Sequence, residues 1–322
     1  KLSPESLISI LEKAASIVGQ SVDPIIGPPE HPSDGLLYGL IQSGKTSIIT
    51  VAAAMAADNG FNCAIVLTSD IDLLYEQTLG RLKRALRGLE VLGKNDWQDT
   101  QRFERKLRNP PFVIVCSKNG SRLSSLLEAF RAARARGLSA FIVDDEADQA
   151  SLNTYANRDT EEVSRINDII TQLRDFFGVN TYLQVTATPQ ALFLQRPDHR
   201  YRPSFTVLSD PGEGYVGGEA FFGDDHRLLR YVDLEEVDLL RTTHQPTPTD
   251  VVPPGLRQAL LTFLVAATVK NIQSPGDGYA FLCHVSVNQR DHEHIVRLIE
   301  RFKEETVNAL RDESSGQRQK LL

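Results

Sequence analysis

Cysteine and long apolar runs are the scarce features of this 322-residue sequence. The three cysteines, Cys63, Cys116 and Cys283, lie far apart in apolar runs, and no C-x-x-C pair occurs. This usage excludes a disulfide-stapled scaffold and is typical of buried thiols in a reducing compartment, so we expect a cytoplasmic protein. The longest nearly apolar stretches, Ile48 to Ala57 and Ala259 to Ala267, are too short to cross a bilayer, which argues against a membrane span.

Positive charge is also in deficit, because 35 Lys and Arg stand against 42 Asp and Glu, for a net charge of −7. This balance argues against a chain that coats nucleic acid non-specifically. The deficit is uneven, however. Residues 81–136 contain 14 basic and five acidic residues, a net of +9, so the remainder carries −16. One region can therefore face a polyanion while the rest of the chain repels it.

Strand-like apolar runs alternate with helical patterns along the chain, which predicts an α/β fold with a parallel sheet and helices on both faces. The predicted strands are Gly35–Gly39, Asn62–Thr68, Phe112–Cys116, Ala140–Asp144, Tyr182–Thr186, Phe205–Leu208 and Tyr279–His284. The predicted helices are Lys45–Asp58, Asp70–Arg87, Asp99–Leu107, Ser121–Ala135, Thr160–Phe177, Gly255–Asn271 and Val287–Leu310. The opening segment 2–19 predicts a further helix rather than a signal peptide, and with Lys1 as the first residue we expect a fragment of a longer chain.

Two shifts in composition predict the domain organisation. Residues 210–223 are glycine-rich and acidic, and residues 245–254 contain four prolines. Both patterns are typical of connecting segments. We therefore expect an N-terminal helical arm (1–30), a first RecA-like lobe (31–209), an acidic insertion and linker (210–254), and the beginning of a second RecA-like lobe (255–322).

The strongest motif is a complete G-x-x-x-x-G-K-T between a predicted strand and a predicted helix. Glycines there let backbone N–H groups surround phosphate oxygens, the lysine reaches the β- and γ-phosphates, and the threonine binds Mg²⁺. The alternative is a chance glycine-rich turn, which the flanking strand and helix disfavour. The predicted nucleotide-binding residues are Gly39, Gln42, Ser43, Gly44, Lys45, Thr46 and Ser47.

A cluster of carboxylates follows the predicted strand Ala140–Asp144, at the sheet edge where ligands of parallel sheets bind. We assign Asp145 to Mg²⁺, directly or through water, and Glu146 to polarising the attacking water. Asp144 takes the metal role if the strand register slips by one residue. Such acids after a strand are also typical of a helix N-cap, and the phosphate loop favours the catalytic interpretation. Lys45, Asp145 and Glu146 are thus the predicted catalytic residues, and Thr46 and Asp145 the metal ligands.

A third strand ends in Thr186-Ala187-Thr188-Pro189, which by itself could be a simple exit from a strand into a turn. Phosphate loop, Asp-Glu-Ala-Asp and Thr-Ala-Thr-Pro, in this order on strand ends, resemble motifs I, II and III of superfamily-two helicases and translocases. The resemblance implies that Thr186 and Thr188 couple the nucleotide site to movement on nucleic acid.

The resemblance narrows to the Z-one domain family, on residues that cover most of the chain. These are Gln42 within Ile-Gln-Ser-Gly-Lys-Thr, the run Asp144–Ser151, the Tyr215-Val216-Gly217-Gly218 turn and Leu282-Cys283-His284-Val285-Ser286. That family is a helicase-like ATPase branch of bacterial restriction-type, anti-phage operons. The resemblance implies DNA as a partner, and a GHKL-type ATPase and a nuclease from the same operon. One departure is that no motif VI with paired arginines is visible, so an arginine finger is expected from elsewhere.

Nucleic-acid contacts are expected from the basic region and from strand ends between the first two motifs, as in helicases that resemble this chain. Solvated helix faces are the alternative for each of these residues taken singly. The predicted contacts are Thr68, Ser69, Arg81, Lys83, Arg84, Ser117, Lys118, Asn119 and Arg122. The sequence thus predicts an ATP- and Mg²⁺-dependent helicase- or translocase-like hydrolase acting on DNA in a defence assembly. A nucleotide-gated binding or endonuclease subunit that does not translocate is the alternative.

Overall fold

The computed structural model describes residues 3–27, 33–41, 43–135, 137–150, 160–193, 201–212, 214–223, 228–242, 249–276 and 278–311. The chain divides into two compact units, residues 1–220 and 221–322. The division falls within the segment 210–254 predicted as insertion and linker. Within the described ranges, no helix combines the length and the apolar character needed to cross a membrane.

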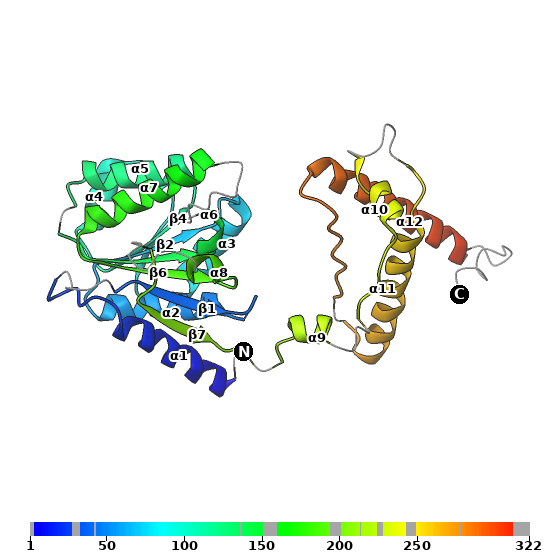
Figure 1. The fold of residues 1–322 in the computed structure, drawn as a ribbon, viewed down its shortest axis with the longest axis horizontal. Coiled ribbons are helices and arrows are strands. Elements are labelled where there is room, and N and C mark those ends of the chain that lie inside the picture. The colour runs from blue at the N-terminus through cyan, green and yellow to red at the C-terminus, as the bar shows by residue number, and fades with distance from the viewer. Residues whose placement is uncertain are drawn as a thin grey trace. The chain divides into compact units, whose positions relative to one another are not determined.

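The first unit is built on a seven-stranded sheet in which every pairing is parallel, so the predicted α/β architecture is confirmed (Figure 1). Its spatial order is β3-β4-β2-β5-β6-β1-β7. The strands are β1 (Gly35–Gly39), β2 (Cys63–Thr68), β3 (Glu90–Leu92), β4 (Phe112–Ser117), β5 (Ala140–Asp145), β6 (Asn180–Thr186) and β7 (Phe205–Ser209). Six of them match predicted strands. The short strand β3 was not predicted, because three residues carry no readable periodicity.

Helices cover both faces of this sheet (Figure 1). One face packs on α1 (Pro4–Gly19), α2 (Lys45–Asp58) and α3 (Asp72–Ala85). The other packs on α4 (Thr100–Leu107), α5 (Gly120–Ala132) and α7 (Thr160–Phe177). Two short helices, α6 (Ala147–Ala150) and α8 (Gln190–Phe193), follow β5 and β6. Strands β2 and β4 are buried throughout, which explains why their sequences are continuous apolar runs rather than alternating patterns.

Local sequence signals account for several helix starts. Ser3 caps α1 by accepting a hydrogen bond from the Ser6 amide at 3.2 Å, and Pro4 occupies the first helical position. Asp99 caps α4 through the Arg102 amide at 3.0 Å. Asn119 caps α5 through the amides of Ser121 and Arg122. Two of the three cysteines, Cys63 and Cys116, are buried and all three are free thiols.

The second unit is helical in its described residues. It contains α10 (Leu234–Leu239), α11 (Pro254–Gln273) and α12 (Gln289–Arg311), while α9 (Gly218–Phe222) lies at the division between the units. Its small core includes Leu256, Leu260, Leu298 and Phe302. The strand predicted over Tyr279–His284 is not formed, and this prediction is wrong. A strand exists only when it hydrogen bonds to a neighbouring strand, and the described residues of this unit include none.

Candidate active site

The phosphate-loop motif forms the connection between β1 and α2. Gly44 precedes the helix with φ of 91°, a left-handed conformation that favours glycine. No described side chain caps the N-terminus of α2, and the Ser47 amide donates to the Gly44 carbonyl, so the amides that precede Ser47 are the ones available to an anion. Gln42, predicted as a nucleotide contact, lies outside the described residues.

Close packing explains the first glycine of the motif. A Cβ atom on Gly39 would lie 2.7 Å from Cβ of Ser209 and 2.8 Å from Oγ of Ser43. The Ser43 hydroxyl is itself buried and has no hydrogen-bond partner among the described residues. A buried polar atom without a partner is costly, and a phosphate oxygen would provide one. The loop therefore fits the group that its sequence predicts.

Lys45 lies across its own loop. Its ammonium donates hydrogen bonds to the carbonyl oxygens of Gly39 at 2.9 Å and Leu40 at 2.8 Å. Burial lowers the pKa of this ammonium, and the nearby carboxylates of Asp145 and Asp148 partly oppose that shift. The cation is thus held within the loop, beside the carboxylates that end β5.

The two aspartates that end β5 point to opposite faces of the sheet. Phe141 and Val143 belong to the core on the α1–α3 face, whereas Ala140 and Ile142 belong to the core on the α4–α7 face. Side chains alternate along a strand, so Asp145 faces the side of α2 and Lys45, and Asp144 faces away. The register of β5 therefore favours Asp145, and not Asp144, as the metal ligand.

Asp144 instead belongs to a buried polar cluster. It is 0% exposed and forms an ion pair with Lys118, whose Nζ lies 2.9 Å from Oδ1 of Asp144. The Tyr182 hydroxyl donates to the other carboxylate oxygen. Arg174 stacks over the ring of Tyr182 and pairs with Asp34 at 2.5 Å. This chain of contacts fixes Asp144 as a structural carboxylate.

Glu146 follows β5 in an unusual backbone conformation, with φ of 57°. The left-handed region costs a residue with a side chain roughly 1–2 kcal/mol. Two hydrogen bonds stabilise this turn, because Nζ of Lys118 donates to the carbonyl oxygens of Asp145 at 2.7 Å and Glu146 at 2.8 Å. The side chain of Glu146 is exposed at the pocket described below.

Asp145 is the carboxylate whose acidity is most affected by this site. Burial, and next the negative charge of Glu146, raise its pKa to about 6. The positive charges of Lys118 and Lys45 act in the opposite direction. A carboxylate that is desolvated and crowded by a second carboxylate is a favourable ligand for a cation.

The two threonines at the end of β6 bond to the carboxylate motif. The Thr186 hydroxyl donates to Oδ1 of Asp148 at 2.6 Å, and the Thr188 hydroxyl donates to Oδ2. The Thr188 amide donates to the Thr186 hydroxyl at 2.9 Å. Asp148 therefore joins the second and third motifs, a role that the sequence analysis did not assign to it.

These segments surround one pocket of about 500 Å³ at the carboxyl ends of β1, β5 and β6. It is lined by Ile41, Ser43, Gly44, Lys45, Thr46, Asp145, Glu146, Asp148, Val185, Thr186, Ala187 and Thr188, and we call it the active-site pocket. The structure thus brings together Lys45, Thr46, Asp145, Glu146 and both threonines. The sheet order causes this, because β6 lies between β1 and β5.

Three of the predicted nucleic-acid contacts are buried, which corrects the prediction. Thr68 is 3% exposed, Ser117 is 1% exposed and Lys118 is 4% exposed. Thr68 and Ser117 end strands β2 and β4, and Lys118 follows β4 directly. A side chain with so little surface cannot contact a nucleic-acid backbone in this structure.

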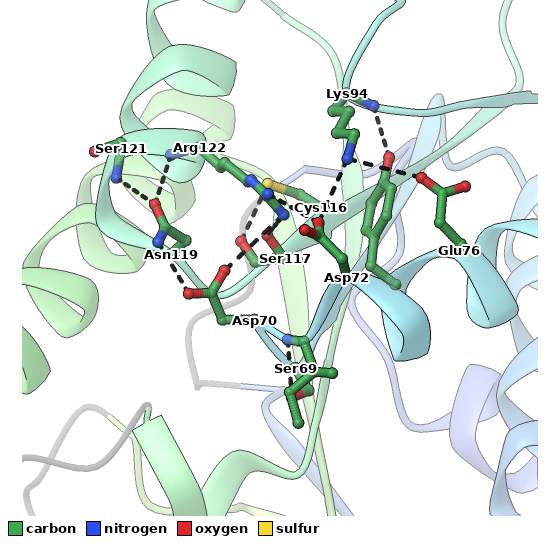
Figure 2. Close-up of polar contacts among 12 residues, drawn as sticks. Ser69, Asp70, Asp72, Glu76, Lys94, Cys116, Ser117, Asn119, Ser121 and Arg122 are labelled. Carbon is green, nitrogen blue, oxygen red and sulfur yellow. Dashed lines mark hydrogen bonds and ion pairs between the residues drawn. The ribbon is translucent and has the colours of Figure 1, made fainter. Parts of the chain in front are cut away.

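Two others, Arg122 and Asn119, belong to a local polar network around two aspartates, and a third, Ser69, lies beside it (Figure 2). Arg122 donates to the Ser117 hydroxyl at 2.9 Å and to Oδ1 of Asp72 at 3.0 Å. Asn119 donates to Asp70 at 3.0 Å while it caps α5. The Ser69 hydroxyl accepts from the Ile71 amide at 3.5 Å. A phosphate would have to displace these carboxylates, so the network weakens the case for Arg122 and Asn119.

The remaining three, Arg81, Lys83 and Arg84, are exposed on α3. Within the described part of the chain, no hydrogen bond or ion pair involves their side chains. Arg81 and Arg84 line a pocket of about 460 Å³ together with Thr46, Ser47 and Thr50 of α2. Arg136, the last residue of the basic region, lies outside the described residues. The C-terminal end of α3 is thus the part of this region with unpaired cations beside the phosphate loop.

The glycine-rich turn of the Z-one resemblance also reaches the loop. The Tyr215 hydroxyl donates to the carbonyl oxygen of Ile41 at 2.7 Å. Gly217 allows this pose, since a Cβ there would lie 2.3 Å from Cε1 of the Tyr215 ring. Tyr215 and Lys118, like Asp148, make contacts in the site that residue patterns alone do not assign.

A comparison of the chain with models of known protein families finds no match, and neither does a comparison with curated proteins.

Proposed function

We propose that this chain is an ATP- and Mg²⁺-dependent hydrolase, the motor part of a helicase- or translocase-like protein that acts on DNA. The observation that carries the ATPase part is the active-site pocket. The phosphate loop, the Lys45 ammonium and the carboxylates of Asp145, Glu146 and Asp148 together line this cavity of about 500 Å³. DNA, the defence assembly, and the GHKL-type and nuclease partners are supported by the resemblance to the Z-one domain family.

The loop and its lysine bind the phosphates in this proposal. Amides at the start of α2 donate to phosphate oxygens, and the orphaned Ser43 hydroxyl gains an acceptor. The Lys45 ammonium moves from the Gly39 and Leu40 carbonyls to the β- and γ-phosphates. Thr46 and Asp145 hold Mg²⁺, which neutralises charge on the phosphates when it is bound.

Glu146 is the general base. Its exposed carboxylate accepts a proton from the attacking water, and its place on the pocket wall orients that water. Thr186 and Thr188 bond to Asp148, two residues beyond Glu146, so a rearrangement at the pocket moves the end of β6. We infer that this link couples turnover to movement on DNA.

The first test measures ATP hydrolysis and nucleotide binding in three proteins. We expect Lys45→Ala to lose both, because the cation on the phosphates is gone. Glu146→Gln keeps the size of the side chain but loses the base, so binding should persist while turnover falls roughly a hundredfold or more. Wild-type turnover in Lys45→Ala would refute the assignment of the loop.

The second test concerns DNA and uses the unpaired cations of α3. Neutralising Arg81, Lys83 and Arg84 to Gln should lower DNA affinity and flatten the log–log salt dependence by roughly 0.7–0.9 for each lost contact. The matched control neutralises three exposed cations of α12: Arg290, Arg297 and Lys303. Equal losses of DNA affinity in the two variants would refute the proposal that the cations of α3 bind DNA.

A nucleotide-gated binding subunit that does not translocate is the second candidate, and the scarcity of cations in the pocket supports it. Lys45 is the one cation among the described residues that line the pocket, and no arginine lines it. A phosphoryl-transfer site without an arginine finger turns over slowly. Hydrolysis that DNA stimulates would support the motor. ATP-dependent assembly with slow turnover, unaffected by DNA, would support the gated subunit.

A further inference from the structure

Lys118 occupies a site built for one ammonium group. It follows directly on β4, is 4% exposed and lies beneath the turn that ends β5. Its ammonium donates hydrogen bonds to the carbonyl oxygens of Asp145 at 2.7 Å and Glu146 at 2.8 Å, and it forms an ion pair with Oδ1 of Asp144 at 2.9 Å. Neutralising Asp144 accounts for one of these contacts and leaves the other two unexplained.

The two carbonyl contacts bear on the direction of the Glu146 side chain. If β5 continued as a strand, alternation would place Glu146 on the face of Asp144, away from Lys45. Glu146 instead adopts φ of 57°, and its side chain lines the active-site pocket beside Asp145. The left-handed residue turns the chain, and both carbonyl oxygens converge on one ammonium.

We propose that Lys118 is a positioning residue for catalysis, which holds the left-handed turn at Glu146 through the backbone and so places the general base in the pocket. The proposal rests on the ATPase function proposed above. Lys118 contacts neither nucleotide nor metal in this role. The simpler alternative is that Lys118 serves the fold alone, as the partner of a buried aspartate.

The double variants are chosen so that Asp144 is never left ionised beside a neutral residue 118. Asp144→Asn is the reference, because it keeps an acceptor for the Tyr182 hydroxyl and leaves the ammonium on both carbonyls. Lys118→Met with Asp144→Asn differs from it only at residue 118. Lys118→Gln with Asp144→Asn restores two N–H donors for the carbonyls, and replaces the methionine variant if that protein does not fold.

The activity arm separates positioning from folding. Relative to Asp144→Asn, we expect the methionine variant to bind nucleotide within about twofold but to turn over roughly a hundredfold more slowly, the scale of losing a general base. The glutamine variant should recover part of the rate. In a Glu146→Gln background, the same change at residue 118 should lower the turnover rate hardly at all, since the base is already absent. An undiminished loss in that background, or unchanged turnover, would overturn the proposal.

A second arm needs no enzymatic activity. If Lys118 holds the left-handed turn, Glu146→Gly should be more stable than Glu146→Ala when Lys118 is present, and this difference in stability should vanish when Lys118→Met and Asp144→Asn are also made. Urea unfolding measures it. Persistence of the preference would overturn the proposal. If the wild-type chain does not hydrolyse ATP, the proposed function fails, while this arm still decides whether Lys118 sets the turn.

Discussion

The backbone at Glu146 allows a stability measurement with an unusual sign. We expect Glu146→Gly to be more stable than Glu146→Ala, although alanine is ordinarily the better residue. The left-handed conformation at φ of 57° costs alanine roughly 1–2 kcal/mol, and glycine avoids this cost. Glycine loses roughly 0.5–1 kcal/mol more conformational entropy on folding. The free energy of unfolding of Glu146→Gly should therefore exceed that of Glu146→Ala by about 0.5–1 kcal/mol.

Glu128 is the matched control position. It lies within α5, where helix propensity favours alanine over glycine by roughly 1 kcal/mol. Both positions start from glutamate, so each pair of variants removes the same charge. The two Gly-minus-Ala differences should have opposite signs and be separated by about 1.5–2 kcal/mol, well above fitting error.

Urea unfolding followed by circular dichroism measures the four variants, and the free energy of unfolding is taken from the transition of the first unit. Alanine equal to or better than glycine at residue 146 would refute the left-handed turn. The same preference for glycine at both positions would show that the effect is not specific to the turn.

Three further outcomes follow from the contacts of the site. Without Mg²⁺, Asp145→Asn should stabilise the protein at pH 7–8 by up to about 3 kcal/mol. The folded pKa of about 6 lies above the ordinary 3.8, so ionisation opposes folding. This gain should shrink as the pH falls from 6 and vanish below 3.8, and a gain independent of pH would contradict the shift. Arg174→Met should cost about 3–5 kcal/mol in urea unfolding, since it removes the cation that pairs with the buried carboxylate of Asp34, and a loss under 1 kcal/mol would contradict the buried pair. Thr186→Ala with Thr188→Ala should keep basal ATP hydrolysis but lose its stimulation by DNA, and intact stimulation would contradict the coupling role.

The strands and the phosphate loop could be predicted because their signals are local. A buried parallel strand is a continuous apolar run in the sequence. The glycines and the lysine of the loop motif directly indicate a tight phosphate-binding turn. An unbroken apolar run does not reveal, however, on which face of the sheet each side chain lies. Apolar residues occupy both faces of β5, so the sequence left Asp144 and Asp145 as alternatives, and only the position of α2 decides between them.

Contacts between distant segments could not be predicted. Lys118 stands between Ser117 and Asn119, a polar surrounding that indicates a surface residue. Its burial depends on the turn after β5, which lies 27 and 28 residues further along the chain. The strand predicted over Tyr279–His284 failed for a related reason, because its composition favours a strand but no described partner in its unit pairs with it.

The order of strands in the sheet has a consequence for folding. The active-site pocket is assembled from segments near residues 39–46, 145–148 and 185–188, which meet only after β1, β6 and β5 have paired. Such long loops close late, so the pocket is absent from partly folded chains. A ligand of this pocket therefore binds only chains in which these three strands have paired. Its binding energy should be added to the stability of the whole first unit, as a rise in one cooperative transition.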